Sequence, residues 1–137
     1  MDCELNDELR MMNQSPKTIQ QALEEPYSLP KSQISFFREN GFVKLKNVLT
    51  PEVVEYMDAT ITYEVKRLNT QHLPLQDRDT YGKAFLQIKN IWTQSISVKE
   101  IVFCKRLARL ATELMEVNGV RMFHDQALYK EPGGGIT

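Results

Sequence analysis

The stretch GVRMFHDQALYKEPGGGIT, residues 119–137, combines β-branched and aromatic residues with an adjacent His-Asp pair and a run of glycines. A helix-stop signal, Asn118-Gly119, precedes its apolar part and a Pro-Gly break follows it. The pattern predicts a strand over residues 120–130. Because side chains alternate along a strand, Gln126 and Lys130 would share one face. On that face a buried Gln126 amide would need a ligand carboxylate, a backbone group or a cross-strand partner, and the pattern leaves these alternatives open.

The His124-Asp125 pair suggests a metal site, but neighbours on a strand point to opposite faces and cannot both hold one ion. The other histidine, His72, lies in a predicted loop, whereas a facial iron triad needs two histidines and a carboxylate that converge. We therefore favour a strand histidine with a structural partner and predict no metal ligand. The glycine run lacks the Gly-Lys-Ser/Thr ending and the following helix of a phosphate loop, so it predicts a turn.

Upstream of this strand, apolar spacings of three and four predict mostly helices. A short helix is expected from Ser15 to Leu23, and a second begins near Pro30 and ends at a left-handed cap on Gly41. Thr50-Pro51 supplies an N-cap and a proline at the first helical position. The long helix that follows would bury a stripe made of Val54, Met57, Ile61, Val65 and Leu68.

Two more helices are expected before the strand. A capping box of Ser97 with Glu100 would open a short helix through Phe103. The last helix would run from Lys105 to about Val117 and bury Leu107, Leu110, Ala111 and Leu114. Its basic residues fall opposite this stripe and predict a solvated face instead of a nucleic-acid site: Lys105, Arg106 and Arg109.

Three further segments carry weaker patterns. Alternation in FVKLKNV, residues 42–48, predicts a half-buried strand. Residues 69–82 show no sustained period and predict a loop that borders a ligand cleft. The segment KAFLQIKNIW, residues 83–92, is ambiguous between strand and helix. If it is a strand, Gln87 and Lys89 share a face, which suits a dicarboxylate site or an exposed edge strand with a protruding lysine.

Composition places the chain among ordinary folded proteins. Its 137 residues are 42% hydrophobic and carry a net charge of −1, which does not indicate nucleic acid or an anionic membrane as a partner. Two distant cysteines, Cys3 and Cys104, suit reduced thiols, and the N-terminus lacks the pattern of a signal peptide. We therefore expect a cytoplasmic protein with a loosely ordered acidic arm over residues 1–29 and one folded domain over residues 30–137.

Three blocks together resemble a known family: ISFFRENGFVKLKNVLTPEVVEYM, AFLQIKNIW and GVRMFHDQALYKEPGGGIT. In this order and spacing they are similar to the N-terminal half of the phytanoyl-CoA dioxygenase family of Fe(II)- and 2-oxoglutarate-dependent oxygenases, over residues 30–137. The resemblance implies an α+β fold, with N-terminal helices packed on part of a double-stranded β-helix, or jelly roll, that is incomplete in this chain. In the family, the last block leads into an H-x-D iron motif, and this chain would end just before it.

The resemblance also implies roles for particular residues. Gln126 and Lys89 fall where family members contact the cosubstrate, Gln87 is a nearby alternative, and Lys130 would help to order the loop that leads to the metal. A complete member would use Fe(II) and 2-oxoglutarate to hydroxylate a small molecule. This chain alone would hold neither cofactor tightly and would be inactive. The alternative is a non-catalytic binding or assembly module, and unpaired strand edges of an incomplete sheet would favour self-association.

Overall fold

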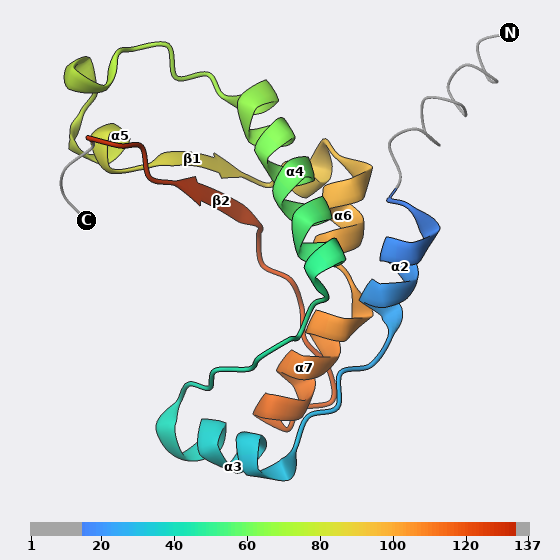
Figure 1. The fold of residues 1–137 in the computed structure, drawn as a ribbon. Coiled ribbons are helices and arrows are strands. Elements are labelled where there is room, and N and C mark those ends of the chain that lie inside the picture. Colours follow the sequence, from blue (N-terminus) through green and yellow to red (C-terminus); the bar gives the residue numbers. More distant parts are fainter. Residues whose placement is uncertain (1–14, 134–137) are drawn as a thin grey trace, which may run out of the picture.

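The computed structural model describes residues 15–133 as helices that flank one small antiparallel sheet (Figure 1). The helices are α2 (Lys17–Glu24), α3 (Lys31–Asn40), α4 (Pro51–Leu68), α5 (Thr80–Ala84), α6 (Ile96–Val102) and α7 (Lys105–Met115). Two short 3-10 helices, η1 (Leu75–Asp77) and η2 (Ile91–Thr93), lie before α5 and before α6. The strands are β1 (Leu86–Lys89) and β2 (Gln126–Tyr129). The fold is therefore mixed helix and sheet, as the sequence predicts.

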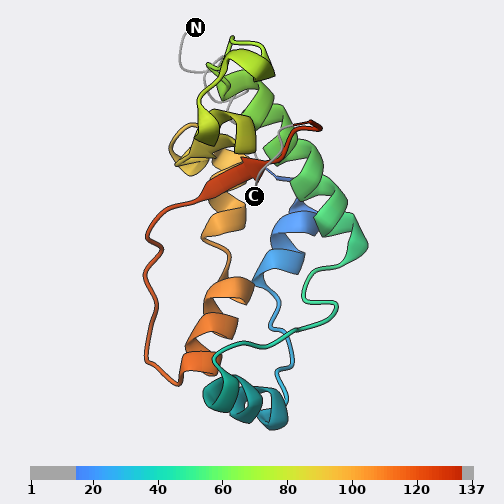
Figure 2. The same cartoon turned by 90° about the vertical axis from the view of Figure 1, so that its left-hand side faces the viewer.

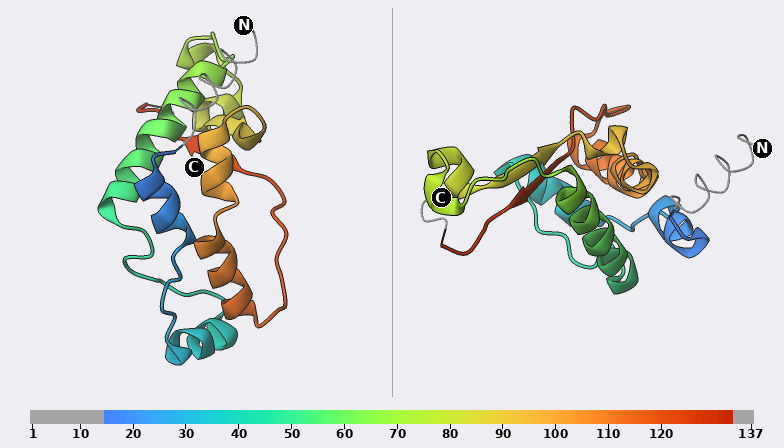
Figure 3. Two further views of the ribbon diagram at one scale, coloured as in Figure 1. Left: turned by 90° about the vertical axis from the view of Figure 1, so that its right-hand side faces the viewer. Right: turned by 90° about the horizontal axis from the view of Figure 1, so that it is seen from above.

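The sheet and α5 extend to one side of the helices (Figure 3), and the connection from α7 to β2 runs back along them (Figure 2). Residues 90–125 lie between Lys89, the last residue of β1, and Gln126, the first residue of β2, so the two strands pair across a long connection. Among the described helices, none combines the length and the apolar character that a membrane-spanning segment requires.

Local signals in the sequence set the start of α4 and the end of α3. The Thr50 hydroxyl accepts a hydrogen bond from the Val53 N–H at 3.4 Å, and Pro51 occupies the first helical position of α4. Gly41 follows α3 with a φ of +78°, a left-handed conformation that glycine adopts without strain, and its N–H donates to the Phe37 carbonyl at 2.8 Å. Both caps confirm the prediction from sequence.

The apolar stripe of α4 differs from the prediction at its first turn. Val53 is only 1% exposed, whereas Val54 is 50% exposed. Val53 lies four residues before Met57 and Val54 three before it, so both positions fit a helical stripe. The contact with α2 selects Val53. Further along, Val65 is buried as predicted.

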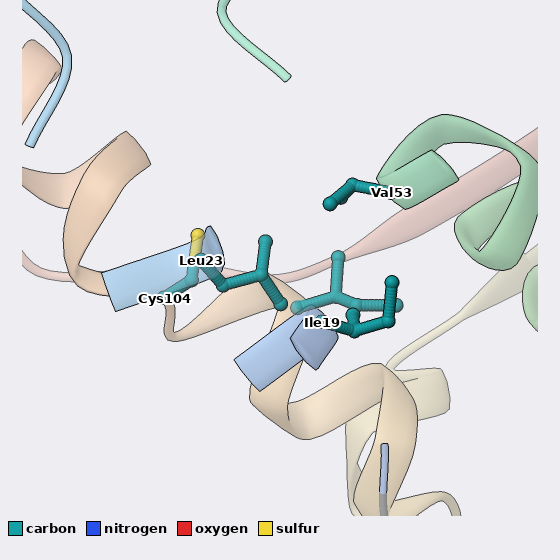
Figure 4. Packing of buried hydrophobic residues seen from close by; sticks show 5 residues of the cluster. Ile19, Leu23, Val53 and Cys104 are labelled. Carbon is teal, nitrogen blue, oxygen red and sulfur yellow. The ribbon is translucent and has the colours of Figure 1, made fainter. Parts of the chain in front are cut away.

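Two clusters of buried side chains hold the elements together. The first joins α2, the start of α4 and the α6–α7 junction (Figure 4), through Ile19, Leu23, Val53, Ile101 and Cys104. The second joins the end of α4, η2, α6 and β2, through Val65, Ile91, Val98 and Ala127. Helices α4 and α6 contribute to both clusters, so they connect the sheet to the helices at the other end of the molecule.

The first cluster corrects the predicted acidic arm. Ile19 and Leu23 are buried in it, and the Ser15 N–H donates to the Glu100 carboxylate at 2.8 Å. The packed part of the chain therefore begins by Ser15 and not near Leu29. The rest of the predicted arm, residues 1–14, lies outside the described residues. The predicted helix from Ser15 to Leu23 is confirmed by α2.

Several predicted elements differ in extent. Residues 42–48 form no strand: Val43 and Leu45 are half-buried between exposed neighbours, but no described strand lies beside them to complete a ladder. The strand predicted over residues 120–130 is confined to β2, because β1 offers four partners. The ambiguous segment, residues 83–92, contains the end of α5, all of β1 and the start of η2. The predicted loop over residues 69–82 contains η1 and the start of α5.

The caps of the last two helices also differ. Ser95, not Ser97, caps α6, and its hydroxyl accepts from the Val98 N–H at 3.4 Å. Glu100 is therefore free of the predicted capping box and bonds to Ser15 instead. Helix α7 ends at Met115 because Glu116 adopts a left-handed conformation with a φ of 53°. The predicted turn of the glycine run is present at residues 132–133, and its remainder lies outside the described residues.

Arg106 contradicts the predicted solvated face of α7. Its guanidinium donates to the Glu25 carbonyl at 2.8 Å and to the Val48 carbonyl at 2.6 Å. It thereby ties α7 to the segments after α2 and before α4. Lys105 and Arg109 are exposed, as predicted.

Candidate functional site

The register of the sheet decides which predicted residues lie together. Lys89 pairs with Gln126, and Gln87 pairs with Leu128, so these side chains share one face. The other face carries Ile88 opposite Ala127 and Leu86 opposite Tyr129, and its side chains pack on the second cluster. The Tyr129 hydroxyl also bonds to the Thr62 hydroxyl of α4 at 2.6 Å. The helices therefore cover one face, and the predicted cosubstrate residues lie on the opposite one.

The uncovered face corrects the hypothesis that Gln126 is a buried amide. Gln126 and Lys89 are both exposed, because the small Ala127 side chain is the one that turns toward the helices. Lys89 makes no ion pair with another residue of the described part. An ammonium and an amide directly opposite each other on adjacent strands are two donors that one carboxylate can accept.

The other two predicted residues do not join this pair. The Gln87 amide oxygen accepts a hydrogen bond from the Tyr81 hydroxyl of α5 at 2.6 Å, and Gln87 lines a cavity that neither Lys89 nor Gln126 lines. Lys130 is exposed just beyond the end of β2. The structure thus brings Lys89 and Gln126 together, holds Gln87 at a neighbouring cavity, and leaves Lys130 at the margin.

The cavity beside Gln87 has a volume of about 320 Å³ and lies between the segment after α4, helix α5 and strand β1. The segment after α4 contributes Asn69, Thr70 and Gln71 to the cavity lining, and the start of α5 contributes Asp79 and Tyr81. The Asp79 carboxylate caps α5 by accepting from the Gly82 N–H at 2.6 Å. The predicted loop therefore does border a cleft, and the cleft is lined largely by polar groups.

Arg78 holds the loop to the end of the sheet. Its side chain is only 9% exposed; it forms an ion pair with Glu131 and donates to the Leu73 carbonyl at 2.9 Å. These contacts join residues before α5 to the residue that follows Lys130. Sequence reasoning missed Arg78, because a charged residue in a loop carries no pattern that distinguishes a buried ion pair from a solvated side chain.

His124 and Asp125 have separate roles. The Asp125 carboxylate accepts hydrogen bonds from the Ile91 N–H at 3.0 Å and the Trp92 N–H at 3.4 Å, and its carbonyl accepts from the Asn90 N–H at 2.9 Å. Asp125 thus satisfies the first backbone donors of η2. His124 is exposed and makes an edge contact with Phe123 at 4.8 Å between ring centroids. Within residues 15–133, no three His, Cys, Asp or Glu side chains converge where they could hold a metal ion.

Among the residues that the structure describes, Cys104 is the one cysteine; it forms no disulfide and is buried in the first cluster. Burial raises the pKa of the Cys104 thiol above its ordinary value. A neutral, inaccessible thiol is a poor nucleophile, so Cys104 acts as a packing residue. Cys3 lies outside the described residues.

No protein-family model, curated protein or solved structure matches this chain. The resemblance to an oxygenase family therefore stays a prediction, and the site is interpreted from its own chemical groups.

Proposed function

We propose that this chain provides the helical support and two sheet strands of an Fe(II)- and 2-oxoglutarate-dependent oxygenase of the phytanoyl-CoA dioxygenase type. In this proposal the uncovered face of β1 and β2 would line the inside of a jelly roll and contact the cosubstrate. The observation that carries it is the pairing of Lys89 with Gln126 on the face turned away from the helices. Both residues are the ones that the sequence resemblance associates with 2-oxoglutarate.

The chemistry of the pair suits this cosubstrate. 2-Oxoglutarate is a dicarboxylate, and the Lys89 ammonium can give one of its carboxylates a charge-assisted hydrogen bond while the Gln126 amide donates a second. The described residues do not fit an iron centre, since Asp125 is engaged by backbone donors and His124 is exposed without a second ligand beside it. The proposal therefore assigns them no metal ligand, and we expect these residues alone to be catalytically inactive.

The test is a titration of 2-oxoglutarate into the isotope-labelled chain, followed by NMR. We expect weak, millimolar binding with shifts centred on the Gln126 side-chain amide and on β1. The variant Lys89→Met should abolish these shifts, whereas Lys66→Met, which removes an exposed lysine on α4, should not. Equal binding by both variants would refute the proposed role of Lys89. Tight binding that requires Fe(II) would contradict the absence of metal ligands from these residues.

A second candidate is a non-catalytic assembly module, and the exposed apolar side chains favour it. Leu128 is 47% exposed on the same uncovered face, and Phe123 is 93% exposed just before β2. Each strand also has one edge that pairs with no described strand, which suits addition of a strand from another chain. Sedimentation of the purified chain tests this candidate. A concentration-dependent dimer that Leu128→Lys abolishes would support it, and a monomer at all concentrations would count against it.

A further inference from the structure

The polar cavity beside β1 has a distinctive arrangement of hydrogen-bond donors. Three of its lining residues are side-chain amides, Asn69, Gln71 and Gln87. In each case the amide oxygen is already used: Asn69 accepts from the Gln71 N–H at 2.8 Å, Gln71 from the Leu73 N–H at 3.1 Å, and Gln87 from the Tyr81 hydroxyl at 2.6 Å. A backbone N–H can only donate, so the orientations of the Asn69 and Gln71 amides are fixed by their partners.

The amide nitrogens are left for another partner. Within the described part of the chain, the NH₂ groups of Asn69, Gln71 and Gln87 donate to no protein acceptor. Each NH₂ group carries two N–H donors, and a hydrogen bond from a half-buried donor to an acceptor lowers the free energy. The cavity therefore suits a molecule that offers several acceptor oxygens.

The charges around the cavity narrow the class of ligand. Its lining contains no Lys, Arg or His among the described residues, and it contains one carboxylate, Asp79. An anion would find no cation there and would be repelled by Asp79. The second Asp79 oxygen can accept a hydrogen bond from a ligand, because the first is used by the Gly82 N–H. A ligand that both accepts and donates, without a charge of its own, matches these groups.

We propose that this cavity binds a neutral polyhydroxylated molecule of about the size of a monosaccharide. Each hydroxyl group of such a molecule can accept from an amide NH₂ and donate to Asp79. The Tyr81 ring is exposed at the cavity and provides an apolar surface for the C–H groups of a sugar or polyol. The volume of about 320 Å³ lies at the small end of the range for ligand pockets and suits a single ring.

This site is separate from the proposed 2-oxoglutarate contact, because Lys89 and Gln126 do not line the cavity. It requires neither iron nor catalytic activity, so it can be tested by binding alone. Failure of either proposal would leave the other standing, since Lys89→Met tests one and Gln71→Ala tests the other.

The experiment is a titration of the full chain with D-glucose and, separately, with myo-inositol. The readouts are the side-chain NH₂ signals of Asn69, Gln71 and Gln87 in nitrogen–proton correlation spectra. We expect these signals to shift and saturate with at least one of the two probes. Gln71→Ala should weaken binding about fivefold to tenfold, the loss for one hydrogen bond of ordinary strength. The matched control is Gln76→Ala, an exposed glutamine of the same loop that does not line the cavity, and it should bind as the unmodified chain does.

Tyr81→Phe gives a second test that keeps the aromatic ring. It removes the hydroxyl that orients Gln87, so the Gln87 NH₂ signals should lose their shift while those of Gln71 keep theirs. The absence of saturable shifts with both probes would overturn the proposal. Saturable shifts with acetate but with neither polyol would also overturn it, because they would assign the cavity to an anion.

Discussion

Replacing Asp125 with alanine should destabilise the fold, whereas replacing its neighbour His124 should have little effect. The Asp125 carboxylate receives two backbone N–H groups at the start of η2, at 3.0 Å and 3.4 Å. One of these donors belongs to Ile91, whose side chain is buried in the second cluster. Without Asp125, both donors lose a charged acceptor in a half-buried environment.

The magnitude follows from the two contacts. A hydrogen bond to a charged group contributes about 1.5–3 kcal/mol, and the longer contact falls well below that range. We therefore expect Asp125→Ala to lower the free energy of unfolding by about 2–3 kcal/mol, which lowers Tm by on the order of 10 °C for a domain of this size. Asp125→Asn keeps one neutral acceptor oxygen and should lose about half as much. His124→Ala removes an exposed ring and should stay within about 0.5 kcal/mol of the unmodified chain.

Urea unfolding followed by circular dichroism measures these differences directly. If Asp125→Ala unfolds at the same urea concentration as the unmodified chain, its carboxylate does not stabilise η2 and the reasoning is wrong. A metal site would give a different pattern: a divalent ion would raise Tm, and both His124→Ala and Asp125→Ala would abolish that increase. The two adjacent residues therefore separate the structural role from the metal role.

Three further outcomes are expected. Val53→Ala should lower the free energy of unfolding by about 2 kcal/mol and Val54→Ala by less than about 0.5 kcal/mol, as measured by urea unfolding, because only Val53 is buried. Arg106→Met should lower the free energy of unfolding by about 2–3 kcal/mol in thermal unfolding, because it removes the donor to the Glu25 and Val48 carbonyls. Arg109→Met on the exposed face should leave the free energy of unfolding nearly unchanged. Because burial raises the pKa of the Cys104 thiol, the unfolded chain loses the thiol proton at a lower pH than the folded chain. The free energy of unfolding should therefore fall as pH rises above about 8.5. Cys104→Ala should flatten that decline in a series of unfolding curves measured at increasing pH.

The predictions that succeeded from sequence rest on local chemistry. The Thr50-Pro51 cap and the left-handed Gly41 are set by residues within one helical turn, so no distant partner is needed to recognise them. The sequence leaves β1 ambiguous because its four residues, two apolar ones alternating with Gln87 and Lys89, are too few for the period to separate a strand from a helix. Its partner β2, more than thirty residues away, makes it a strand.

Burial of particular faces could not be predicted in the same way. Alternation along β2 correctly puts Gln126 and Leu128 on one face, but it does not say which face meets the helices. The second cluster selects the face of Ala127. For the same reason Arg78 and Arg106 had no recognisable signal, since their acceptors lie on segments that only the tertiary fold brings near them.

The two proposed functions begin from one physical fact, a two-stranded sheet packed on a single face. A short isolated pair of strands is marginally stable in water, so β1 and β2 depend on the contacts of Ile88 and Ala127 with the helices. The opposite face adds nothing to that packing and carries Lys89 beside Gln126 at one end and Leu128 at the other. Covering Leu128 is favourable in either function, because any apolar partner removes it from water. Covering Lys89 is costly unless an anion accompanies it, and an assembly surface has no need of a charge at that position. Lys89 is therefore the residue whose substitution distinguishes the two functions: an oxygenase loses its cosubstrate without it, and an assembly module gains by its removal.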